Sequence, residues 1–224
     1  MHIPDGYLGP ATCGLFYAIM LPIWAAASRI VKKTLNARQV PLLAIGAAFS
    51  FVIMMFNVPI PGGTTGHAVG AVLAAILLGP WASCIVVTVA LVVQALLFGD
   101  GGITAIGANC FNMAFIEVFS GYYLYKLISG PSPFTSGRRV IAAGIAGYVA
   151  INVAAFSAAV MFGIQPLLHK TANGQSLYCP YGLNVAIPVM LGEHMLIFGW
   201  VEAMVTALVV KYLQKHDPSL LEAA

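Results

Sequence analysis

The sequence has 224 residues, of which 60% are hydrophobic and 8% are charged, and its mean hydropathy is +0.92. Soluble domains carry about 25% charged residues, so the composition excludes a soluble globular protein and indicates an integral membrane protein. At about 20 apolar residues per spanning helix, the chain could hold about seven or eight spans and no separate soluble domain. We therefore expect residues 1–224 to form a single membrane-embedded domain.

Prolines, glycines and clusters of charge divide the apolar sequence into runs of spanning length. These runs predict seven transmembrane helices, over residues 11–28, 41–57, 64–79, 81–98, 109–127, 140–163 and 187–210. The division at Gly79-Pro80 is the least obvious, because residues 68–98 form one apolar stretch. A single helix there would place the downstream basic residues on the wrong side, so we expect a tight cytoplasmic turn at Gly79-Pro80.

The basic residues predict the orientation, because lysine and arginine are retained on the cytoplasmic side of a membrane. With the N-terminus outside and the C-terminus cytoplasmic, nine of the ten lysines and arginines fall inside and only Lys170 falls outside. The predicted fold class is an all-α integral membrane protein with seven transmembrane helices in this orientation.

The chain opens with Met1-His2. Residues 1–10 lack the basic region of a signal peptide, and the first apolar run ends in a basic cluster rather than a cleavage pattern, so we expect the N-terminus to be retained and to face outward. The Met1 amine, the His2 amide nitrogen and the His2 imidazole could then close two small chelate rings around one cation. They would supply three of the four nitrogens of a square-planar site. A chance histidine in second place is the simpler interpretation of the dipeptide alone.

The outer segment Val58–Gly66 contains two prolines and three glycines. This composition favours a loop folded over a cavity, with its backbone close to another group, rather than a passive connector. His67 follows the loop directly. We expect its imidazole at the outer mouth of the third span, on the same side as Met1 and His2.

Ionisable residues also fall inside the predicted spans, where they are costly and usually face the interior of the bundle. They are Glu117, Glu193, His194 and Glu202. We interpret them as polar groups that join helices by hydrogen bonds, with a transport role as the alternative. His169 and His216 are expected at the surface.

The sixth predicted span has an alanine every fourth residue, at Ala142, Ala146, Ala150, Ala154 and Ala158. Small residues at this spacing let helices approach closely, here most often within the bundle. The four cysteines show no metal-binding spacing and are expected to behave as small hydrophobic residues. The sequence also lacks a GxxxxGK[ST] motif, so any ATP hydrolysis would belong to partner subunits.

Three further motifs share the outer side in this topology. They are the opening Met1-His2-Ile3-Pro4-Asp5-Gly6, the loop ending in Gly66-His67, and the Gly99-Asp100-Gly101-Gly102 turn followed by Asn109 and Asn112. Together with the seven spans they resemble the nickel/cobalt substrate-binding subunit of energy-coupling-factor transporters, the NikM/CbiM family. The resemblance covers essentially the whole chain, and the opening motif is more similar to the nickel members than to the cobalt members.

The resemblance implies a six-helix core with an extra N-terminal helix, and a subunit that captures Ni²⁺, or Co²⁺ as second choice, at the outer face of a prokaryotic cell membrane. The implied partners are a transmembrane coupling subunit and two cytoplasmic ATPase subunits, with a small accessory membrane subunit as a further candidate. Neither an enzymatic activity, an organic cofactor nor a nucleic-acid partner is implied. The family's metal ligands fall on the Met1 amine, the His2 backbone nitrogen and imidazole, and the His67 imidazole. Asn109, Asn112 and Thr64 are suggested as neighbours of the site.

The proposed ligand set also fits the metal, since four nitrogens in a plane suit Ni(II) or Cu(II), whereas Mg²⁺ and Ca²⁺ prefer oxygen. Other functions remain open. The chain could be a stand-alone secondary permease or channel for a metal cation, or an intramembrane enzyme that uses Glu193 and His194. A vitamin-binding subunit of the same transporter class is a nearer alternative, but it would not need the Met1-His2 start.

Overall fold

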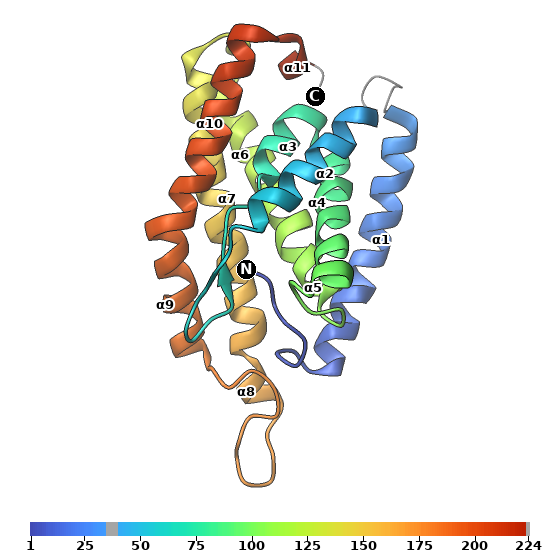
Figure 1. Ribbon diagram of the computed structural model, residues 1–224, viewed down its shortest axis with the longest axis vertical. Helices are drawn as coiled ribbons and strands as arrows, with labels where there is room; N and C mark the ends of the chain where they lie inside the picture. Colours follow the sequence, from blue (N-terminus) through green and yellow to red (C-terminus); the bar gives the residue numbers. More distant parts are fainter. Residues whose placement is uncertain (35–39, 223–224) are drawn as a thin grey trace.

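Most of the predicted apolar runs form helices that lie side by side along the long axis of the bundle (Figure 1). The computed structural model describes residues 1–34 and 40–222. The helices are α1 Pro10–Thr34, α2 Val40–Met54, α3 Ala71–Leu78, α4 Pro80–Val93, α5 Ile106–Asn109, α6 Val118–Ser129, α7 Gly137–Gly163, α8 Gln165–Leu168, α9 Leu183–Glu193, α10 Gly199–His216 and α11 Ser219–Glu222. Three π-helical segments, η1 Gln94–Phe98, η2 Cys110–Glu117 and η3 His194–Phe198, continue α4, α5 and α9 within these described ranges.

Helix length distinguishes the candidate membrane spans from the shorter helices. Among residues 1–34 and 40–222, four helical segments are long and apolar enough to cross a membrane: Pro10–Thr34, Pro80–Phe98, Gly137–Leu168 and Leu183–His216. Helix α2 has 15 residues and α3 has only 8. The predicted break at Gly79-Pro80 is present, because α3 ends at Leu78 and α4 begins at Pro80.

The third predicted span differs from the structure at its outer end. A helix was expected over residues 64–79, but α3 begins only at Ala71. The preceding chain forms a two-stranded antiparallel hairpin, β1 Val58–Pro59 and β2 Thr65–Gly66, with Val58 opposite Gly66. Gly70 then has φ +72°, a left-handed conformation that keeps the chain from continuing as a helix toward β2.

A carboxylate from α10 holds the two residues that precede the short helix α3. Glu202 Oε2 accepts hydrogen bonds from the backbone N–H groups of Val69 and Gly70, at 2.8 Å and 2.9 Å. Ser50 of α2 donates to the Val69 carbonyl at 2.8 Å. Glu202 and Ser50 therefore anchor the chain between His67 and the start of α3.

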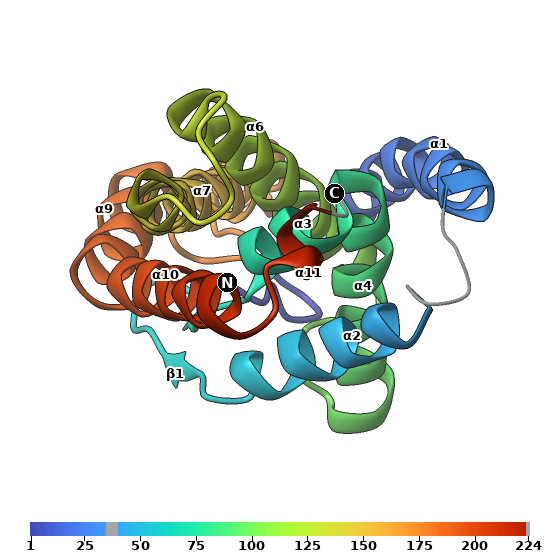
Figure 2. The same cartoon turned by 90° about the horizontal axis from the view of Figure 1, so that it is seen from above.

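The alanine stripe of α7 lies inside the bundle, as predicted. All five alanines, Ala142, Ala146, Ala150, Ala154 and Ala158, have no exposed surface. The helix packs against α6, α9 and α10, which surround it in the view from above (Figure 2). Helix α1, in contrast, lies at the edge of the bundle and contacts α4 and α5 (Figure 2).

The edge helix α1 touches α5 backbone to backbone, which gives the first prediction. A Cβ on Gly107 would lie 2.7 Å from the Tyr17 nitrogen and 2.9 Å from the Phe16 carbonyl carbon, and neither backbone atom can rotate away. We expect Gly107→Ala to lower the stability by about 1–3 kcal/mol through overpacking, measured by thermal unfolding in detergent. The control is Gly14→Ala in α1, where nothing lies within 4 Å of the new Cβ and replacing a helical glycine is expected to be neutral or stabilising. Equal unfolding midpoints for the two variants would contradict the close contact.

Candidate metal site

The start of the chain is buried among the helices rather than free at the surface (Figure 1). Met1 and Ile3 have no exposed surface and His2 is 3% exposed. Asn109 holds Ile3 on both sides of its backbone, because Oδ1 accepts from the Ile3 N–H at 2.8 Å and Nδ2 donates to the Ile3 carbonyl at 3.1 Å. The Gly102 N–H donates to the same carbonyl at 2.9 Å. The first three residues therefore have one defined position.

The loop between η1 and α5 completes this attachment. The Asp5 carboxylate accepts hydrogen bonds from the Ile103 N–H at 3.1 Å and the Thr104 N–H at 2.9 Å. A Cβ on Gly102 would come within 2.7 Å of the Pro4 carbonyl carbon, so only glycine allows the two backbones to lie this close. The opening motif and the Gly99–Gly102 turn thus fit each other.

Two predicted ligands, 66 residues apart in the sequence, meet at the end of this segment. The Met1 amino nitrogen lies 2.9 Å from His67 Nε2. His67 Nδ1 lies 3.1 Å from the Ala68 carbonyl, which can only accept a hydrogen bond. The proton therefore belongs on Nδ1 and the lone pair on Nε2, facing the amine. Metal–nitrogen bonds of about 2.0–2.1 Å place neighbouring corners of a square about 2.8–3.0 Å apart.

The His2 ring lies beside the His67 ring, with 4.5 Å between centroids. His2 Nε2 is 3.1 Å from Gln94 Oε1, and the Gln94 amide nitrogen donates to the Phe51 carbonyl at 3.4 Å. This pairing orients the Gln94 amide with its oxygen toward His2, so His2 Nε2 carries the proton and Nδ1 the lone pair. Nδ1 is the ring nitrogen closer to the backbone, and it can close a chelate ring with the His2 amide nitrogen.

Thr65 of the hairpin covers the two backbone nitrogens. Its hydroxyl lies 3.2 Å from the Met1 nitrogen and 3.2 Å from the His2 nitrogen, and its carbonyl also accepts from the Met1 amine. The Val58–Gly66 loop therefore folds over the chain start, as its proline and glycine content predicted. A cation bound by these nitrogens would lie directly against the loop.

Burial sets the protonation of the candidate ligands. Desolvation lowers the pKa of the Met1 amine from 8.0 to about 5. Desolvation, and next the nearby amino group, lowers the pKa of His2 from 6.5 to about 3. Both groups are neutral at pH 7, so their lone pairs are available to a metal without prior loss of a proton.

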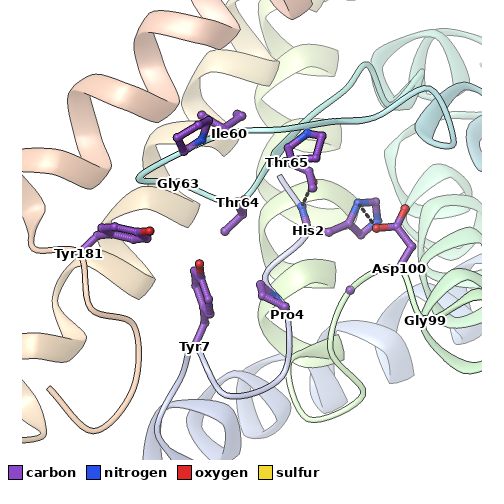
Figure 3. Close-up of a pocket in the computed structure, with 13 residues that line it drawn as sticks. His2, Pro4, Tyr7, Ile60, Gly63, Thr64, Thr65, Gly99, Asp100 and Tyr181 are labelled. Atoms are coloured by element: carbon purple, nitrogen blue, oxygen red, sulfur yellow. Dashed lines mark hydrogen bonds and ion pairs between the residues drawn. The ribbon is translucent and has the colours of Figure 1, made fainter.

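A cavity of about 460 Å³ connects the site with the outer loops (Figure 3). The side chains of Tyr7 and Tyr181 point into it from opposite segments, and Thr64, Thr65, His2 and Asp100 lie along its other side (Figure 3). The cavity is large enough for a hydrated ion to approach the His2 side of the site.

The other polar residues singled out in the sequence lie elsewhere. His194 Nδ1 lies 2.8 Å from the Met190 carbonyl and 3.1 Å from Glu193 Oε2, which agrees with a structural pair. Asn112 contacts the Met161 sulfur, His169 packs on Tyr178, and the thiols of the four cysteines are buried. Asn109 is the suggested neighbour that does touch the chain start, and Thr64 lines the cavity.

Sequence reasoning missed Gln94 and Thr65, and it noted Asp100 only as part of a turn. Gln94 had a signal, since it is the one amide side chain in the apolar run 81–98. A search for side-chain metal clusters would miss the whole site. Within residues 1–34 and 40–222 no group of three or more His, Cys, Asp or Glu is placed to hold a metal, because half of the candidate ligands are backbone nitrogens.

The known proteins that are similar to this chain are described as metal transport proteins. Residues 2–220 match the family model described as CbiM, cobalt uptake substrate-specific transmembrane region. The chain is 52% identical to a fused nickel transport protein NikMN of Rhodobacter capsulatus and 49% identical to a probable fused nickel transport protein LarMN of Lactiplantibacillus plantarum, each over 99% of this chain. It spans only 64% and 66% of the lengths of these relatives.

A solved structure agrees with the fold. The chain is similar to a crystal structure described as a truncated transition metal transporter, with 56% sequence identity and a TM-score of 0.92. The similarity covers 96% of this chain and 99% of that one. The arrangement of helices is therefore shared with a protein that handles a transition metal.

The contact between Gln94 and His2 gives a second prediction. Gln94→Leu removes the acceptor for His2 Nε2–H, so the ring can exchange to the tautomer with its proton on Nδ1. We expect metal affinity, measured by calorimetry with Ni²⁺, to fall about 10–100-fold, as for other groups that orient a ligand. Gln214→Leu is the matched control, because Gln214 donates to the carbonyls of Phe134 and Ser136 away from the site. Similar losses in both variants would show a general packing effect instead.

Proposed function

This chain belongs to the CbiM family of cobalt uptake substrate-specific transmembrane regions, and on that premise we propose that it captures Ni²⁺, or Co²⁺ as second choice, at the outer face of the membrane. As a member of a transmembrane metal transporter family with several apolar helices, it is a multi-pass protein of a prokaryotic cell membrane. Its relatives are nickel and cobalt transport proteins, which supports metal uptake.

The meeting of the Met1 amine, the His2 ring and His67 Nε2 carries this proposal. Four nitrogens would bind the ion: the Met1 amine, the His2 amide nitrogen, His2 Nδ1 and His67 Nε2. The 2.9 Å separation between the Met1 nitrogen and His67 Nε2 is that of neighbouring corners of a planar site. An all-nitrogen planar site favours Ni(II) over hard cations. It would also accept Cu(II), so selectivity against copper depends on the enforced geometry and on the metals available in the cell.

We further propose that seven helical segments cross the membrane, with the N-terminus outside and the C-terminus cytoplasmic. The distribution of lysine and arginine supports this orientation. Helices α2 and α3 are short for spans, and the hairpin before α3 takes the place of its outer turns. Irregular backbone at membrane depth is tolerated where protein buries it, and Thr64, Gly66 and His67 are buried.

The energy for uptake is proposed to come from partners. The sequence has no ATP-binding motif, so we propose that the chain acts as the substrate-capture subunit of an energy-coupling-factor transporter with a transmembrane coupling subunit and two cytoplasmic ATPases. The small accessory membrane subunit is a further proposed partner. Uptake of nickel by vesicles that contain this chain alone would instead support a stand-alone permease.

The third prediction tests the amine directly. One residue added before Met1 keeps every side chain but converts the amine into an amide and moves the new amine away. Because Met1 is fully buried, we expect the extended protein to bind Ni²⁺ at least about a hundredfold more weakly than the original protein. Mass spectrometry should find about one nickel per chain in the original protein and none in the extended protein. One residue added after Ala224 is the control. Equal nickel content in the two extended proteins would refute the N-terminal chelate.

The fourth prediction concerns pH. The pKa values of Met1 and His2, about 5 and about 3, lie below the ordinary values of 8.0 and 6.5. The unfolded chain therefore binds more protons, and these two groups reduce stability as the pH falls from about 8 to about 3. At pH 7 nickel binding should release about one proton, from the His2 amide. Below about pH 5 the amine must also lose its proton, so affinity should fall more steeply with acid.

Calorimetry in buffers with different ionisation enthalpies measures this proton count. Release of no proton at pH 7 would exclude the amide nitrogen as a ligand. Release of two or more would show that the amine or the imidazole is protonated in the folded protein.

A further inference from the structure

Asp100 is the acidic residue among the described residues that line the cavity. It directly follows Gly99 at the end of η1, where its N–H donates to the Gln94 carbonyl at 3.1 Å. One carboxylate oxygen, Oδ2, accepts from Asn57 Nδ2 at 2.8 Å. The backbone of Gln94 and the side chain of Asn57 thus hold the carboxylate at the edge of the site, where its side chain remains 16% exposed.

The second oxygen, Oδ1, faces His2 Nδ1 at 3.6 Å (Figure 3). Because Gln94 assigns the His2 proton to Nε2, both facing atoms carry lone pairs. Within the described part of the chain, His2 Nδ1 has no hydrogen-bond partner. Two acceptors that face each other, one buried and one partly exposed, are unfavourable unless a cation lies near both. The pair is therefore arranged for a positive charge.

A carboxylate at this position would balance the charge of a bound ion. A divalent ion bound by two neutral imidazoles, a neutral amine and one deprotonated amide keeps one positive charge. An unpaired charge in a buried site is strongly disfavoured. One ionised carboxylate makes the site neutral. Glu193, packed against Gly66, and Glu117 are the other carboxylates near the Met1 amine. Glu193 Oε2 lies 3.1 Å from His194 Nδ1, whereas Asp100 is the carboxylate that faces a nitrogen of His2.

The distance also defines how Asp100 would act. A metal about 2.0 Å from His2 Nδ1 would lie close to Oδ1, because the two atoms are only 3.6 Å apart. A metal–carboxylate bond is about 2.0–2.2 Å. Because four nitrogens already complete a planar site, Asp100 would act as a neighbouring counter-charge rather than as a fifth ligand.

We propose that Asp100 is the counter-charge of the metal site and the point at which a hydrated divalent cation first pairs with the protein. The inference rests on the proposed function, since it assumes that the four nitrogens bind the ion. Asp100 faces the cavity on one side and the chelating nitrogen of His2 on the other. It connects the approach of the ion with its final position.

The experiment compares Asp100→Asn with Asp217→Asn. Both lose one negative charge, but Asp217 lies at the end of α10, remote from the chain start (Figure 1). With nickel chloride as the probe, we expect Asp100→Asn to weaken binding about 10–100-fold. We also expect slower association and a weaker dependence of its rate on salt, with the absorption spectrum of planar nickel unchanged. Asp217→Asn should bind like the original protein.

Asp100→Glu separates charge from packing. This variant keeps the negative charge, so it should retain most of the nickel affinity and the salt dependence of the association rate. If Asp100→Asn does not fold, the Asp100→Glu variant still tests whether the charge is needed. Binding by Asp100→Asn within threefold of the original protein would overturn the inference, as would equal losses in the Asn and Glu variants. A changed nickel spectrum in Asp100→Asn would show direct ligation and overturn the counter-charge role. These results differ from failure of the proposed function, in which the original protein itself binds no nickel.

Discussion

The candidate site depends on the burial of the chain start. An α-amine and a peptide nitrogen can serve as ligands only if the backbone that carries them has one position, and here Asn109, Gly102 and Asp5 hold residues 1–5 through backbone hydrogen bonds. Burial then keeps the pKa of the amine low. The hairpin of residues 58–66, the Gly99–Gly102 turn and the segment between His67 and α3 all lie around the chain start. The helices of the bundle therefore enclose the short peptide at the start of the chain.

Hydropathy and turn residues were sufficient to locate most helices and the break at Gly79-Pro80. They failed at residues 64–70, which form a strand and a loop rather than the first turns of a helix, because the conformation depends on tertiary contacts with Glu202 and Ser50. The π-helical segments were also not predicted. A π segment inserts one residue into the helical hydrogen-bond pattern without a local sequence signal, and here η1 begins at Gln94 and η3 at His194.

The candidate site could also be predicted only in part. Met1, His2 and His67 could be proposed from topology and from resemblance, because their residue types and positions are visible in the sequence. Gln94 and Thr65 could not be proposed, because their roles depend on the positions of their side-chain oxygens relative to the ligand nitrogens. A glutamine in an apolar helix indicates a buried polar contact, but its contact with His2 Nε2 appears only in three dimensions. Backbone nitrogens have no residue signature at all.

The bond between Ile3 and Asn109 has a consequence for biogenesis. These residues are 106 positions apart, so Ile3 cannot reach its place until the helix that carries Asn109 is also in place. Contacts of such long sequence separation form late, because a large loop must close before they contribute. The N-terminal peptide is therefore expected to be one of the last parts of the bundle to take its final position.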